Sequence, residues 1–157
     1  MRQLLDVADF MRRVRWEMRF GELSRAPLSL LRLEVRSDHA ECEWIARDPD
    51  PWDMELAPRI TQRRQTLQAL RDAIGVRELL FSMLPQVSTA SFRVYRRSQV
   101  DACDLVVTGS VAREDEVSMR IASVAMRANL YGLRFSLDNG VLQPLQEKDS
   151  GLQLVTN

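Results

Sequence analysis

Hydrophobic and polar positions form their clearest pattern between residues 102 and 145. Residues 104–111 are rich in β-branched side chains, and this short apolar run predicts a strand. The carboxylates at positions 114–116 suit the positively polarised start of a helix, and Gly132 is placed to end it. Between them, apolar residues recur at steps of four, three and four, which indicates one helix face. The residues of that face are Val117, Ile121, Val124 and Ala128.

A tight hairpin is predicted directly after that helix. Alternating apolar and polar residues over 133–138 are typical of a half-buried strand. Asn139 and Gly140 follow, and this pair is favoured in type I′ turns because both central residues of such a turn need positive φ. A two-residue turn at this point sets Leu137 opposite Leu142, so apolar residues meet across the two strands.

Alternation over residues 31–46 predicts an earlier hairpin with one apolar face and one charged face. Its turn lies at 37–39 and includes His39, the only histidine of the chain. We interpret His39 as a solvated turn residue, because no second base or metal ligand lies near it in the sequence. The expected apolar face consists of Leu31, Leu33, Val35, Ala40, Cys42, Trp44 and Ala46.

Amphipathic segments complete the pattern. Residues 3–20 carry a helical stripe of apolar side chains that Gly21 can end. Residues 58–83 predict a helix in two pieces, interrupted at Gly75, and residues 92–97 predict another strand. The face of the longer helical piece expected to be buried consists of Ile60, Leu67, Leu70 and Ile74.

The order of these elements predicts an α+β fold with helices packed on one face of a mainly antiparallel sheet. From Ala40 to Leu137 the elements run β, α, β, β, α, β, which is the order of a ferredoxin-like sandwich. The N-terminal helix and the flanking hairpin strands are additions to that core. We expect one domain over residues 1–157, with residues 146–157 as a frayed tail.

Composition narrows the class of protein without naming a function. The formal net charge is zero, and no apolar run is long enough to cross a bilayer. Asp6 and Asp9 interrupt the region where a signal peptide needs an apolar core, so we expect a cytoplasmic protein that does not enter a membrane. Cys42 and Cys103, the only cysteines, are interpreted as buried, reduced thiols.

An acidic segment over residues 48–55 is the one compositionally unusual stretch. Asp48, Asp50 and Asp53 could bind a hard cation through oxygen. The segment lacks the glycine and the twelfth-position glutamate of a calcium loop, and two prolines stiffen it. We therefore interpret it as a structural loop and predict neither a metal nor a cofactor.

Arginines form the best candidate binding constellation. Three lie in the predicted helix after residue 58 and three in the strand that follows, with Tyr95 among them. Such a face can hold phosphates, although the strand over 104–111 lacks the aromatic pair that stacks RNA bases. An internally paired, solvated face is the alternative interpretation. The six residues are Arg59, Arg63, Arg64, Arg93, Arg96 and Arg97.

Three functional hypotheses remain. The first is a non-enzymatic interaction or scaffold protein that forms a small homo-oligomer or binds another protein, with Trp16 and Phe20 as contact residues. The second is a nucleic-acid-binding module, most simply for RNA, that uses the arginine-rich face. The third is a small-ligand-binding protein or an enzyme whose site is assembled from dispersed residues. The absence of a recognisable catalytic motif favours the first hypothesis.

Overall fold

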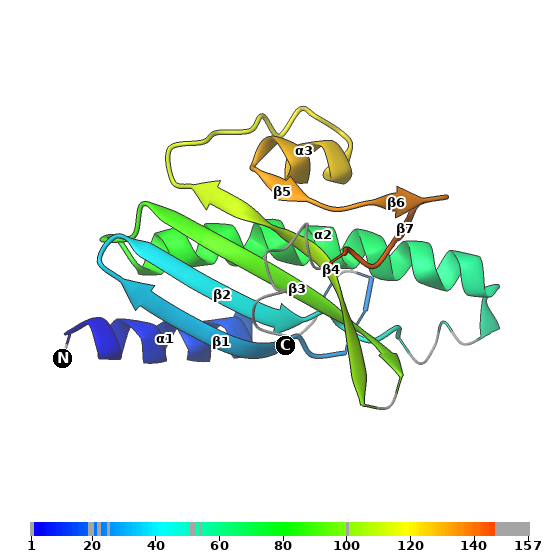
Figure 1. Ribbon diagram of the computed structural model, residues 1–157, viewed down its shortest axis with the longest axis horizontal. Coiled ribbons are helices and arrows are strands. Elements are labelled where there is room, and N and C mark those ends of the chain that lie inside the picture. The colour runs from blue at the N-terminus through cyan, green and yellow to red at the C-terminus, as the bar shows by residue number, and fades with distance from the viewer. Residues whose placement is uncertain are drawn as a thin grey trace.

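The computed structural model describes residues 2–18, 21, 23–24, 26–50, 53, 55–99 and 101–146, with the backbone alone for residues 2–6 and 99. This part of the chain forms three helices and seven strands (Figure 1). The helices are α1 (Arg2–Glu17), α2 (Pro58–Met83) and α3 (Val124–Leu130). The strands are β1 (Ser29–Arg36), β2 (His39–Ile45), β3 (Thr89–Gln99), β4 (Ala102–Ala112), β5 (Leu133–Arg134), β6 (Leu137–Asp138) and β7 (Val141–Leu142).

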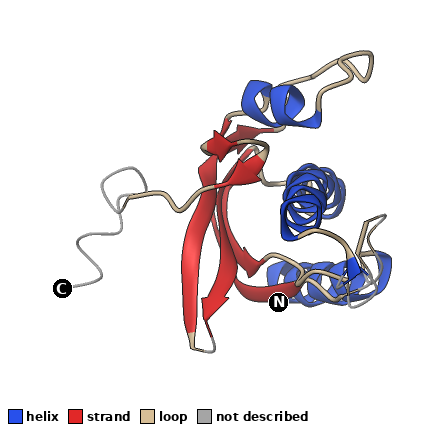
Figure 2. Cartoon of the chain, turned by 90° about the vertical axis from the view of Figure 1, so that its right-hand side faces the viewer, coloured by secondary structure: helices blue, strands red, loops and turns tan. Residues whose placement is uncertain are grey.

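Five strands form one sheet in the order β1-β2-β3-β4-β5, and β6 pairs with β7 in a separate hairpin. Every pairing in the larger sheet is antiparallel except that of β2 with β3, which is parallel and is connected through α2. The helices lie on one side of the sheet, and the described residues place no helix on the other side (Figure 2). The α+β class and the mainly antiparallel sheet are therefore confirmed.

The strand order does not confirm the ferredoxin-like topology. In a split βαβ unit, another strand lies between the two parallel strands that the helix connects. Here β2 and β3 are hydrogen-bonded neighbours over seven residue pairs, from His39 opposite Thr89 to Ile45 opposite Tyr95. The order of helices and strands was predicted correctly as far as β5, but the predicted strand over 133–138 is divided into β5 and β6, which belong to different sheets. Element order also does not determine which strands become neighbours.

The hydrophobic core lies between the sheet and the helices. Alternate residues of β2 are buried, as the sequence predicts, and Trp44 packs edge-to-face on Phe92 of β3 with ring centroids 5.1 Å apart. Phe10 of α1 is fully buried, although it lies beside the predicted apolar stripe. Cys42 is buried, but Cys103 is exposed near the start of β4, so only one of the two thiols is in the core.

Helix α2 is continuous through Gly75, in contrast to the predicted interruption. Its buried face also differs from the prediction, because Ile60 and Leu67 are exposed while Gln68 and Asp72 are buried. These polar side chains are accommodated because they are hydrogen-bonded to each other, from Gln68 Nε2 to Asp72 Oδ1 at 3.0 Å. Apolar periodicity alone therefore misplaces the face of this helix.

A buried ion pair holds α2 to the end of β2. Arg47 Nε lies 2.7 Å from Asp72 Oδ2, and the two side chains are only 2% and 5% exposed. Arg47 also donates to the backbone oxygens of Met18 and Ala26. Burial raises the pKa of Asp72, while the hydrogen bonds from Arg47 and Gln68 oppose that rise. One guanidinium thus connects α1, α2 and the two segments that flank the β1–β2 hairpin.

The predicted helix over 117–128 is wrong in its first half, because α3 begins only at Val124. Arg77, buried in α2, donates to the backbone oxygens of Ala112 and Asp115, which holds this segment in a turn after β4. Ser123 then caps α3 by accepting a hydrogen bond from the backbone N–H of Met126. Side chains from elsewhere in the fold override the local helical pattern.

The C-terminal hairpin is confirmed in its turn and its register. Asn139 and Gly140 both have positive φ, and Leu137 lies opposite Leu142. Gly132 also has the positive φ expected just after α3. It lies against Gly109 of β4 so closely that a Cβ atom on Gly109 would be 2.3 Å from the Gly132 oxygen. The predicted tail lies almost wholly outside the described residues.

Candidate functional site

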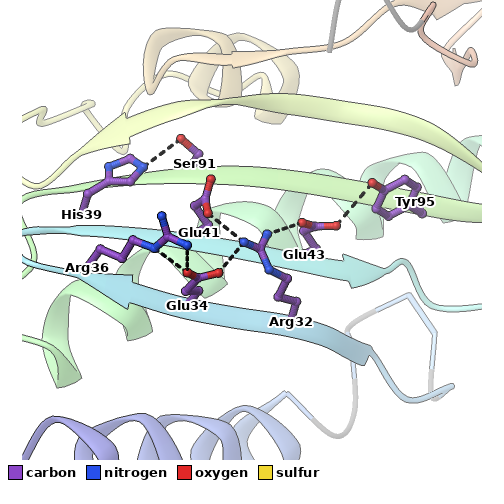
Figure 3. A network of polar contacts seen from close by, with 8 residues as sticks. All are labelled: Arg32, Glu34, Arg36, His39, Glu41, Glu43, Ser91 and Tyr95. Carbon is purple, nitrogen blue, oxygen red and sulfur yellow. Dashed lines mark hydrogen bonds and ion pairs between the residues drawn. The ribbon is translucent and has the colours of Figure 1, made fainter. Parts of the chain in front are cut away.

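The helix-free face of the sheet carries a network of charged side chains (Figure 3). The antiparallel register of β1 and β2 sets Arg32 opposite Glu43 and Glu34 opposite Glu41. The Arg32 guanidinium therefore reaches three carboxylates, at 2.6 Å from Glu34, 2.8 Å from Glu41 and 2.6 Å from Glu43. Arg36 bonds the second oxygen of Glu34. The charged hairpin face predicted from the sequence is thus internally paired.

The paired charges change the acidity of the groups on this face. Hydrogen bonds from Arg32 and then Arg36 lower the pKa of Glu34. The bonds to Glu34, Glu43 and Glu41 raise the pKa of Arg32, which stays a cation throughout the accessible pH range. Because the Arg32 side chain is 41% exposed, water and salt screen these interactions. The network therefore orients side chains on the sheet more than it stabilises the fold.

His39 lies on the same face and bonds two hydroxyl groups of β3. Its Nδ1 is 2.7 Å from Thr89 Oγ1, and its Nε2 is 3.1 Å from Ser91 Oγ. His39 is thus the first residue of β2 and not a solvated turn residue as predicted. The parallel pairing of β2 and β3 brings the three residues together across some fifty positions of sequence, so no local pattern indicates the contact. A histidine beside a serine is the geometry of a general base and a nucleophile. However, a hydroxyl rather than a carboxylate orients this ring.

A polar hollow of about 450 Å³ lies further along the same face, between β2, β3 and β4. Its wall includes Arg93, together with hydroxyl groups such as that of Ser110. Tyr95 lies nearby and donates to Glu43 at 3.4 Å, and burial followed by the charge of Glu43 raises its pKa. The hollow contains both hydrogen-bond donors and acceptors, and its arginines and glutamates leave neither sign of charge dominant.

The outer edge of β1 is a second candidate site. Within the described residues β1 pairs with β2 alone, so it is an edge strand of the sheet, although Val35 near its end makes a further contact. The register shifts between Leu30 and Arg32, and this bulge leaves Leu31 54% exposed instead of on the predicted apolar face. The consecutive leucines Leu30 and Leu31 are the sequence signal that could have indicated the bulge.

An apolar hollow of about 610 Å³ lies where β1 begins. Trp16 of α1 lines it together with Pro27 and Leu28, which directly precede the strand. The Trp16 side chain is 73% exposed, the most of any described tryptophan, phenylalanine or leucine. Phe20, the other residue predicted to contact a partner, lies outside the described residues. Trp16, Pro27, Leu28 and strand β1 together form what we call the β1 surface.

The six candidate arginines do not form one surface. Arg93 lies on the helix-free face, at the 450 Å³ hollow. Arg63 Nε donates to the backbone oxygen of Asn139 at 2.7 Å, and Arg64 pairs with Asp53 at 3.0 Å. The structure gathers the remaining three, which are Arg59, Arg96 and Arg97, around one hollow.

That hollow has a volume of about 600 Å³ and lies between the start of α2, the end of β3 and the β6–β7 hairpin. We call it the arginine hollow. Its wall also contains Asp48, which is paired with Arg97 at 3.1 Å, and Asp138. The sequence identifies these arginines by residue type, but no local pattern in it indicates that three of them converge.

Two carboxylates of the acidic segment over 48–55 form ion pairs with different arginines. Asp48 pairs with Arg97 and Asp53 with Arg64, so these two carboxylates bind arginines and not a shared ion. Among the residues that the structure describes, no group of three or more histidine, cysteine, aspartate or glutamate side chains could hold a metal. In the same part of the chain, no helix has the length and apolar character needed to span a membrane.

Comparisons with known proteins add no further constraint. No protein-family model matches the chain, and neither the search of curated proteins nor that of solved structures finds a match. Any functional conclusion therefore rests on the geometry of this molecule.

Proposed function

We propose that the chain is a single-domain, non-enzymatic interaction protein of the cytoplasm that forms a homodimer through the β1 surface. The observation that carries the proposal is the exposed apolar surface where β1 begins, which includes Trp16, Leu31 and the 610 Å³ hollow. Within the described residues β1 is also an edge strand of the sheet, and edge strands commonly associate with a second strand.

The charges of β1 favour a second copy as the partner. On the helix-free face the strand carries Arg32, Glu34 and Arg36 in turn, so its charges read positive, negative, positive. Two copies of β1 that approach each other antiparallel about a two-fold axis near Leu33 would bring Arg32 of each copy toward Glu34 of the other. An axis near Glu34 would bring like charges together, so only the first arrangement is self-complementary in charge.

The exposed apolar groups supply the remaining contact. Trp16 and Leu31 lie on the β1 side of the molecule, and the 610 Å³ hollow between α1 and the start of β1 is lined largely by apolar side chains. Exposed tryptophans dominate the binding energy of many interfaces because they bury a large area with few rotatable bonds. The charges of β1 would determine how the two copies align, and these apolar side chains would contribute the hydrophobic free energy of association.

The other hypotheses have less support. An RNA-binding face needs phosphate contacts along a continuous track, but the six arginines lie in several separate environments. An enzyme built on His39 and Ser91 would lack a carboxylate that orients the histidine, since the described residues bond its ring to two hydroxyl groups. We therefore do not extend the proposal to either activity.

Native mass spectrometry and sedimentation equilibrium test the dimer with a matched pair of variants. Leu31→Asp places a charge on the β1 edge, while Leu137→Asp places the same charge on an exposed leucine of β6. We expect twice the 18.1 kDa chain mass for the unaltered protein and for Leu137→Asp. We expect the single chain mass for Leu31→Asp, because a buried, unpaired carboxylate opposes association.

Two results would contradict the proposal. If the unaltered protein stays monomeric over the whole accessible concentration range, it does not form the proposed homodimer. A Leu31→Asp variant that dimerises as strongly as the Leu137→Asp control would remove the β1 edge from the interface. Circular dichroism of both variants checks that each retains the fold.

A further inference from the structure

We propose that the arginine hollow binds a phosphate or diphosphate group carried by a small polar molecule. The hollow, about 600 Å³ in volume, is of the size that small-molecule sites usually have. Three guanidinium groups from two separate elements line it, and guanidinium is the side-chain group that best matches phosphate oxygens. This site is distinct from the β1 surface and does not depend on the proposed dimer.

The wall of the hollow is held in place by specific bonds. Arg63 Nε donates to the oxygen of Asn139, which fixes the β6–β7 turn against α2. The backbone of Leu142 is held on both sides, because its N–H donates to Thr66 Oγ1 at 3.0 Å and its oxygen accepts from Arg96 at 2.6 Å. The hairpin thus forms a positioned side of the hollow.

The charges around the hollow leave capacity for an anion. Arg59 makes no hydrogen bond or ion pair with any described residue. The pair between Arg97 and Asp48 is about half exposed on both sides, so a doubly charged phosphate can compete for Arg97. Asp138 faces the hollow too and reduces its positive potential. Helix α2 begins here without an acidic residue in its first turn, and its dipole adds positive potential.

Amide groups around the arginines suit the remainder of such a ligand. Gln65 and Gln143 use their Nε2 atoms in bonds to backbone oxygens, which leaves their Oε1 atoms as acceptors at the hollow. Gln62 lines the same wall. A ligand with N–H or O–H donors beside its phosphate, such as a nucleotide or a sugar phosphate, matches this mixture of groups.

The layout favours a small anion over a nucleic acid. A polymer repeats its phosphates along a strand and needs cationic groups in sequence along a groove. Outside the hollow, Arg63 and Arg64 are engaged with Asn139 and Asp53, and Arg93 lies on the helix-free face of the sheet. Of the six candidate arginines, only the three at the hollow are therefore brought together.

Isothermal titration calorimetry with inorganic pyrophosphate, at constant ionic strength, tests the site in the full chain. Arg59→Gln removes the unpartnered guanidinium without breaking a bond among the described residues. Arg120→Gln removes an equal charge from an exposed loop and is the matched control. We expect one saturable site per chain, a dissociation constant raised on the order of tenfold by Arg59→Gln, and no change in Arg120→Gln.

Each other outcome overturns the proposal. No saturable binding of pyrophosphate would exclude a phosphate site, and equal weakening in both variants would show that only net charge matters. A single-stranded RNA oligonucleotide serves as the competing ligand. RNA binding that Arg59→Gln abolishes, in a protein that does not bind pyrophosphate, would assign the hollow to a polymer. Failure of this test leaves the dimer proposal unaffected, because the two sites share no residue.

Discussion

Two sets of arginine–carboxylate contacts occupy opposite sides of the sheet and differ in their surroundings. The pair of Arg47 and Asp72 lies on the helix side and is almost fully excluded from water. The network around Arg32 lies on the helix-free side and is partly exposed, with more ion pairs but less burial. The same chemical groups therefore contribute differently to stability. The unfolding free energy lost when an ion pair is broken depends on how far the pair is excluded from water and not on the number of contacts.

The largest effect should come from Asp72→Ala. Removing this carboxylate takes away the buried ion pair that the Arg47 guanidinium makes with Asp72, which should lower the free energy of unfolding by about 3–5 kcal/mol. Urea denaturation of the variant and the unaltered protein measures this change in unfolding free energy. The double variant Arg47→Met with Asp72→Leu should be less destabilised than Asp72→Ala, although the oxygens of Met18 and Ala26 then lose their donor. A double variant as unstable as the sum of its single changes would refute this account.

The two regions should also respond to pH in opposite directions. Burial raises the pKa of Asp72, so the folded state binds its proton more tightly than the unfolded state does. Relative to Asp72→Asn, the unaltered protein should lose stability as pH rises from about 4 through that raised pKa. Ion pairing lowers the pKa of Glu34. Relative to Glu34→Gln, the protein should lose stability as pH falls below about 4.

Thermal denaturation of the three proteins across the acidic range measures both differences. The direction of each change in stability with pH is the informative result. Its size should be smaller for Glu34, because that carboxylate is partly exposed and screened by salt. A difference of the same sign at both positions would mean that burial does not govern Asp72.

The smallest effect should come from Glu41→Gln. This change removes one of three carboxylates from Arg32 in a partly exposed setting and should cost about 0.2–1 kcal/mol of unfolding free energy. The loss should shrink between about 0.1 M and about 1 M salt, since added ions screen exposed charges. Urea titrations at the two concentrations measure it. A loss that is large and independent of salt would place the network in a drier environment than its exposure indicates.

The hairpins could be predicted from the sequence because their determinants are local. Asn139 and Gly140 specify their own turn, and the alternation of β2 shows directly which of its residues are buried. Bulges could not be predicted in this way, because one inserted residue moves every later side chain of the strand to the opposite face of the sheet. The register shift at Val94 makes Val106 an extra residue of β4, so it joins the core beside Val107 although regular alternation along a strand would place the two on opposite faces.

Contacts between distant segments could not be predicted. Nothing near residue 117 indicates that Arg77 would hold the turn after β4 and shorten the following helix. The candidate sites show the same limit. The sequence identified Trp16 and the arginines by type, but the hollow that joins Arg59 with Arg96 exists only because α2 begins beside the end of β3.

The parallel pairing of β2 and β3 has a consequence for how quickly the sheet can assemble. The β1–β2 and β3–β4 hairpins each close over a short span of chain, whereas β2 meets β3 only after the whole of α2 intervenes, with His39 opposite Thr89. Closing so long a loop costs chain entropy before any contact compensates for it, and such non-local pairings slow folding. We therefore expect the pairing of β2 with β3 to form after the two hairpins and to limit the rate at which the sheet assembles.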